Sequence, residues 1–146
     1  MVAMLHESRG EQEEARRQYE SIVASHPAAG VAANNLAWMY AESGKLDEAV
    51  SLANAARGAL PRRPEPEDTL GWALLKKGRV QEAIAAFERA VARAPRNATY
   101  RYHLGLAYVK AGNSKHARRA LTDALALQAD FPGADDARAK LAGIQP

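Results

Sequence analysis

Small residues recur in this chain with a fixed period of 34 residues. Two sets keep the spacing from end to end: Ala15, Ala49, Ala83 and Ala117, and Gly10, Gly44, Gly78 and Gly112. A period of this length is typical of arrays in which each unit buries its apolar face against its neighbours. We therefore expect one structural unit that has been copied about four times.

Each unit has the pattern of two short helices. In segments 34–41 and 83–94 apolar residues recur at helical spacing. The periodic glycine lies between the two segments, where it can adopt the left-handed conformation that ends a helix. A proline follows the second segment and cannot continue a helix, at Pro27, Pro61 and Pro95. The unit is thus predicted to be a helix, a tight turn and a second helix.

The small residues also predict how the two helices pack. One small column lies in the first helix of each unit, at Ala37, Gly71 and Gly105. We expect it to face the alanines of the second helix, at Ala49, Ala83 and Ala117. Larger side chains such as Tyr40 and Phe87 would fill the remaining space between units.

The third unit, "DTLGWALLKKGRVQEAIAAFERAVARAP", resembles the tetratricopeptide repeat family, whose signature combines W, L-G and Y in the first helix with A, F, A and P in the second. The matching residues are Leu70, Gly71, Gly78, Ala83, Phe87, Ala90 and Pro95. Arrays of 35-residue hairpins that read RNA are the main competitor, and a strict period of 34 argues against them. The resemblance implies an all-α, right-handed solenoid of about four helix-turn-helix units with a C-terminal capping helix.

The unit boundaries follow from this register. Three full units are expected at residues 30–63, 64–97 and 98–131, with a capping helix at 133–144 whose outer side is polar. The first unit, 1–29, is expected to be truncated: its first helix would end before a turn at Gly10. Val2, Met4 and Leu5 would then lack a preceding repeat, which predicts either upstream repeats or a homo-oligomer formed through the N-terminal end.

Composition limits the compartment and the partners. No apolar stretch is long enough to span a membrane, and no signal peptide is visible, so cytoplasm and periplasm both stay open. The net charge of +3 is interpreted as a solvated convex surface rather than a nucleic-acid surface, because the arginines and the aromatic residues belong to different faces. These arginines are Arg16, Arg17, Arg62, Arg63, Arg89, Arg93, Arg96, Arg118 and Arg119.

Nothing in the sequence points to catalysis. The four histidines, His6, His26, His103 and His116, are far apart and form no metal-ligand motif. There is no cysteine, no nucleophile motif and no phosphate-binding glycine loop. We expect no enzymatic activity, no metal and no cofactor.

The resemblance also implies a concave groove lined by the first helix of each unit. Transferred to this sequence, its positions are Asn34, Asn35, Trp38, Glu42, Asp68, Trp72, Lys76, Tyr102, Leu106 and Lys110, with Met4, Glu7 and Ser8 from the truncated unit. The groove is predicted to bind a peptide segment or a helix of another protein.

Trp38 and Trp72, the only two tryptophans, stand one period apart in this groove. They are either interface residues for an apolar or aromatic segment or half-buried packing residues. Asn34 and Asn35 either bond the backbone of a ligand or are solvated. The clamp with which some family members hold a C-terminal carboxylate is disfavoured, because the tryptophans occupy an asparagine column and Asp68 would repel the carboxylate.

The predicted function is a protein-interaction adaptor. The alternative is a structural module that assembles through the ends of the solenoid. The runs "NNLAWMYAESGKLDEAV" and "YHLGLAYVKAGNSKHARRAL" are also similar to repeats of bacterial envelope-associated members of the family.

Overall fold

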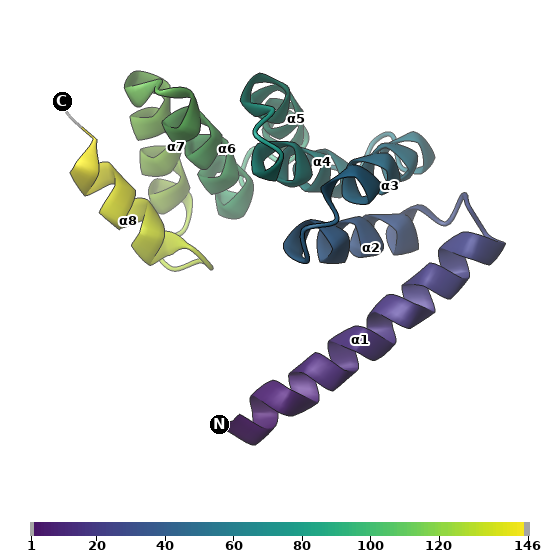
Figure 1. The fold of residues 1–146 in the computed structure, drawn as a ribbon. Coiled ribbons are helices and arrows are strands. Elements are labelled where there is room, and N and C mark those ends of the chain that lie inside the picture. Colours follow the sequence, from purple (N-terminus) through teal and green to yellow (C-terminus); the bar gives the residue numbers. More distant parts are fainter. Residues whose placement is uncertain (1, 145–146) are drawn as a thin grey trace.

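The computed structural model of the protein describes the backbone of residues 2–144 and the side chains of residues 9–144. Eight helices and no strand occur in this part of the chain (Figure 1): α1 (Val2–Ser25), α2 (Gly30–Glu42), α3 (Leu46–Ala59), α4 (Glu65–Lys76), α5 (Val80–Arg93), α6 (Ala98–Ala111), α7 (Ser114–Leu127) and α8 (Ala134–Gly143). The predictions for the side chains of Val2, Met4, Leu5, Glu7 and Ser8 lie outside the described residues.

The helices from α2 to α7 form three successive hairpins. Within each hairpin the two helices pack on each other, and each second helix also packs on the next first helix. The first helices contact one another in turn, α2 with α4 and α4 with α6. Figure 1 shows the resulting row of hairpins, with α8 covering its C-terminal end and α1 diverging from α2 at the other end. The predicted solenoid of helix-turn-helix units is confirmed.

Three of the four periodic glycines are turn residues that need a left-handed backbone. Gly44, Gly78 and Gly112 have φ values of 86°, 83° and 76°. A Cβ atom at any of them would meet nothing within 4 Å, so backbone conformation, not space, requires glycine there.

The fourth periodic glycine does not form the predicted turn. Gly10 lies inside α1, which continues from Val2 to Ser25 without a break. A glycine inside a helix costs only about 1 kcal/mol relative to alanine, and the neighbours Arg9, Glu11 and Gln12 are good helix formers. The prediction of a truncated helical hairpin before residue 25 is therefore wrong.

One face of α1 consequently has no first helix to cover it. Ala15 and Tyr19 stand in the same columns as Ala83 and Phe87, which are fully buried at 0% exposure. In α1 both positions are only half-buried. This face borders the cavity described below.

The small residues of the first helices pack against bulky side chains of the second helices, not against the alanines expected to face them. A Cβ atom at Gly71 would lie 2.6 Å from the ring of Phe87, and one at Gly105 would lie 2.6 Å from Leu121. The expected pairing of small with small residues is thus replaced by small with large. It is the ring of Phe87 that excludes a side chain at Gly71.

Two of the arginines interpreted as solvated, Arg89 and Arg93, converge instead on one buried carboxylate. Glu67, in the first turn of α4, is 1% exposed. Its oxygens accept hydrogen bonds from Arg89 at 2.9 Å and Arg93 at 2.8 Å, both on α5, and Arg57 of α3 lies 3.9 Å away. The cluster ties α4 to the two second helices beside it.

The helix α8 closes the C-terminal end of the core. Phe131, Ala134 and Ala137 are buried against Ala98 and Leu121 of the last hairpin. The first turn of α8 is acidic, and Asp135 and Asp136 face solvent. Among the residues that the structure describes, no helix has both the length and the apolar character needed to cross a membrane.

Candidate functional site

A cavity of about 640 Å³ opens between α1 and the first helices α2, α4 and α6. We call it the N-terminal groove. Four of the ten predicted groove residues line it: Asn34, Asn35, Trp38 and Asp68. The remaining wall comes from Glu11, Gln12, Ala15, Tyr19, Met39, Glu65, Thr69 and Tyr100. The groove therefore includes a face of α1 that the sequence analysis assigned to the second helix of the first unit, where a first helix would have covered it.

An aromatic stack lies beside this groove. The rings of Trp38 and Trp72 are stacked with centroids 5.6 Å apart and planes 17° apart. His103 extends the stack, 4.9 Å from Trp72 and 6.1 Å from Trp38. Both tryptophans are half-buried, so they pack against neighbouring helices while Trp38 keeps a surface on the groove.

His103 holds the buried carboxylate of Asp68. The two residues are 7% and 6% exposed, and Nδ1 of His103 lies 2.8 Å from Oδ1 of Asp68. Asp68 is thus a partnered group at the base of the groove. Sequence reasoning missed His103 because no histidine has a neighbouring ligand in sequence. The equivalent positions in the two preceding units are Asn35 and Thr69, so this position is polar in every full unit. That repeated polar residue could have identified His103 from the sequence.

The two asparagines differ in their bonding. Asn35 donates from Nδ2 to the hydroxyl of Tyr19 at 3.3 Å and so links α2 to α1. The Oδ1 atom of Asn34 is buried and has no hydrogen-bond partner, the one such side-chain atom among the described residues. A buried acceptor without a donor costs about 1–3 kcal/mol.

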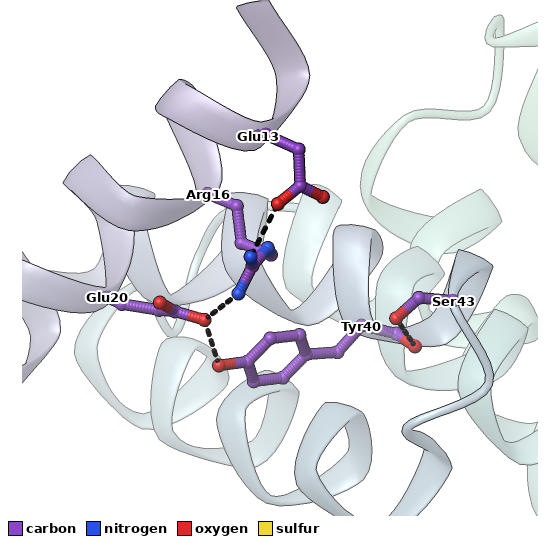
Figure 2. Close-up of polar contacts among 5 residues, drawn as sticks. All are labelled: Glu13, Arg16, Glu20, Tyr40 and Ser43. Atoms are coloured by element: carbon purple, nitrogen blue, oxygen red, sulfur yellow. Dashed lines mark hydrogen bonds and ion pairs between the residues drawn. The ribbon is translucent and has the colours of Figure 1, made fainter. Parts of the chain in front are cut away.

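A second cavity of about 750 Å³ adjoins the first, with Trp38 and Met39 lining both. Its wall carries a hydrogen-bonded chain that joins α1 to α2 (Figure 2). Arg16 donates to Glu13 at 2.6 Å and to Glu20 at 2.7 Å, and the Tyr40 hydroxyl donates to Glu20 at 2.7 Å. The bond from Tyr40, and then Arg16, keep the pKa of Glu20 below its ordinary value, so this carboxylate stays ionised.

The predicted groove residues of the second and third units meet at the ends of their helices. Glu42 accepts a hydrogen bond from Nε1 of Trp72 at 2.7 Å and lies 3.6 Å from Nζ of Lys76. The Lys76 ammonium also lies 5.5 Å from the Trp72 ring. These three side chains therefore bind one another across α2 and α4.

The residues predicted from the fourth unit lie away from the N-terminal groove. The Tyr102 ring packs on Phe131 with centroids 5.7 Å apart, and its hydroxyl donates to Asp136 of α8. Burial, and then Asp136, raise the pKa of Tyr102 above its ordinary value. Leu106 is half-buried and Lys110 is exposed. Tyr102 thus belongs to the contact with the capping helix.

No group of three or more histidine, aspartate or glutamate side chains in the described part of the chain is arranged to hold a metal ion. Among the polar groups around the groove, Asp68 bonds His103 and Asn35 bonds Tyr19. Chemically, the arrangement offers acceptors and aromatic faces to a ligand.

Comparison with known proteins agrees with the fold. The family model described as tetratricopeptide repeat matches residues 3–64 and 69–135. No curated protein matches the chain.

Solved structures share the fold at low sequence identity. A thermophilic tetratricopeptide repeat protein of Thermus thermophilus is 21% identical, with a TM-score of 0.79 over 98% of this chain and 77% of that one. A fragment of MamA from Desulfovibrio magneticus RS-1 is 20% identical, with a TM-score of 0.74 over 84% and 69%. The first tetratricopeptide repeat domain of Spaghetti (RPAP3), bound to the HSP90 peptide SRMEEVD, is 19% identical, with a TM-score of 0.73 over 79% and 89%.

Proposed function

Because the chain belongs to the tetratricopeptide repeat family, we propose that it is a non-enzymatic adaptor that holds a segment of another protein in its N-terminal groove. The observation that carries the proposal is the cavity of about 640 Å³ formed by four helices, with predicted groove residues Asn34, Asn35 and Trp38 on its wall. A peptide bound to a domain of the same fold supports this use of the architecture.

The groove has the features of a recognition surface. Trp38 offers a half-buried indole, and tryptophan is among the residues that contribute most to binding energy at protein interfaces. Asn34 and Asn35 place side-chain amide groups on the same wall.

The proposal is tested by affinity capture from an extract of the source organism, followed by calorimetry with a peptide from the captured partner. We expect Trp38→Ala to weaken binding by about 2 kcal/mol, as for an interface hot spot. Arg96→Ala, an exposed residue outside the groove, is the matched control. Thermal melts of both variants separate a lost contact from a lost fold. Equal affinity of the wild type and a folded Trp38→Ala would reject the groove as the binding site.

One observation favours a second candidate, assembly through the N-terminal end. The half-buried Ala15 and Tyr19 occupy columns that a first helix covers in every other unit. A helix from a second copy could cover them, in line with the need of solenoid ends for a cap. Sedimentation equilibrium of the wild type and Tyr19→Lys decides: a dimer that the substitution dissociates supports assembly, and a monomer in both cases rejects it.

A further inference from the structure

The charge of the N-terminal groove is opposite in sign to that of the whole protein. The chain has 20 lysines and arginines against 17 acidic residues, a net charge of +3. The charged side chains that line the groove are nevertheless all acidic: Glu11, Glu65 and Asp68. A cleft with walls of one sign concentrates ligands of the other sign.

Local partners offset this charge only in part. Glu65 pairs with Arg63 at 2.9 Å, and Asp68 is hydrogen-bonded to Nδ1 of His103 at 2.8 Å. Glu11 is exposed and makes no ion pair with any residue whose side chain is described. At Tyr100, burial raises the pKa of the hydroxyl to about 12, and the charges of Asp68 and Glu65 add to the shift.

The aromatic surface of the groove also favours a cation. The Trp38 ring lines the groove, and its stacked partner Trp72 already has the Lys76 ammonium 5.5 Å from its ring. A guanidinium or ammonium group attracts both an aromatic face and a carboxylate.

We propose that the groove selects a basic peptide segment, in which an arginine or lysine side chain enters between Glu11 and Trp38. The inference rests on the proposed function, since it names the chemistry of the segment that the groove would hold. It is the opposite of the acidic peptide SRMEEVD held by the Spaghetti domain. No lysine or arginine lines the groove within the described residues, so nothing there would neutralise an acidic ligand.

Selection from a random peptide library displayed on phage tests the inference with the intact chain as bait. Binding of the selected peptides is then measured by the intrinsic fluorescence of the protein, which reports on the groove because Trp38 and Trp72 are its only tryptophans. We expect the selected peptides to be rich in arginine and lysine and to bind less tightly as salt is added.

Charge reversal at one exposed position provides the sharpest variant. Glu11→Lys should weaken a selected basic peptide about tenfold at low salt, because it reverses the sign of an exposed charge on the groove wall without disturbing a buried group. Glu14→Lys, also exposed on α1 but outside this groove, is the matched control and should leave the affinity unchanged within about twofold.

The outcomes separate the inference from the function on which it rests. Acidic or neutral peptides that still compete for the groove, or equal losses in Glu11→Lys and Glu14→Lys, would overturn the charge selectivity and leave the adaptor function standing. If no selected peptide changes the tryptophan fluorescence, both the basic ligand and the groove as a peptide site are rejected.

Discussion

Glu67 is the charged side chain on which the packing of α4 depends most directly. It is 1% exposed, and Arg89 and Arg93 donate to different oxygens of its carboxylate. We expect Glu67→Gln to lower the free energy of unfolding by about 1–2 kcal/mol, because two charge-assisted hydrogen bonds weaken while the arginines remain partly hydrated. Urea denaturation provides the measurement.

The control for this substitution is an exposed carboxylate with a similar partner. Glu82 pairs with Arg79 at 2.6 Å, and both side chains are about half exposed to water, so Glu82→Gln should change stability by no more than about 0.5 kcal/mol. Equal midpoints for Glu67→Gln and the wild type would show that the arginines contribute nothing through this carboxylate.

Glu67 and His103 show what the sequence could not supply at this scale. Columns at a period of 34 identify equivalent positions, but they do not identify which columns face each other across two helices. Glu67 bonds Arg89 and Arg93 on the second helix of its own unit, and Asp68 bonds His103 on the first helix of the next unit. Each contact depends on the angle and offset at which two helices cross. The residue pattern of one helix does not specify either of them.

At the scale of helices, Gly10 and Gly44 occupy equivalent repeat positions, but substitution by alanine should change stability in opposite directions. Gly10 lies within α1 with nothing within 4 Å of an added Cβ atom, whereas Gly44 has a φ of 86°. Gly10→Ala should stabilise α1 by about 0.5–1 kcal/mol through helix propensity. Gly44→Ala should destabilise by about 1–2 kcal/mol, because a side chain disfavours the left-handed conformation.

Thermal melts followed by circular dichroism compare the two variants directly. A loss of stability in Gly10→Ala as large as that in Gly44→Ala would mean that residue 10 forms a turn, as its column in the sequence suggests.

The repeat pattern predicted the helices from α2 to α8 as three pairs and a cap. It was wrong for α1 because a glycine column does not distinguish a glycine that a turn requires from one that a helix tolerates.

At the scale of the whole molecule, contacts run mainly between neighbouring helices, so the solenoid is close to one-dimensional. The 34-residue period was sufficient to predict this architecture, because it specifies how each unit buries its neighbour. The groove was predictable only in part. Asn34, Asn35, Trp38 and Asp68 follow from the repeat register, but Glu11 and Tyr19 line the groove only because α1 is continuous.

One-dimensional packing also predicts that damage at one end stays local. Phe131 is 5% exposed and joins the capping helix to α6 through Tyr102, so Phe131→Ala should destabilise the C-terminal end by about 3–5 kcal/mol. Leu127→Ala, at a position 38% exposed, is the control and should cost much less. Native-state hydrogen exchange should show faster exchange in α6, α7 and α8 and unchanged protection in α2 and α3, since stability in a repeat array is a sum of unit and neighbour terms. A uniform loss of protection from α2 to α8 would instead mean that the array unfolds as a single cooperative unit.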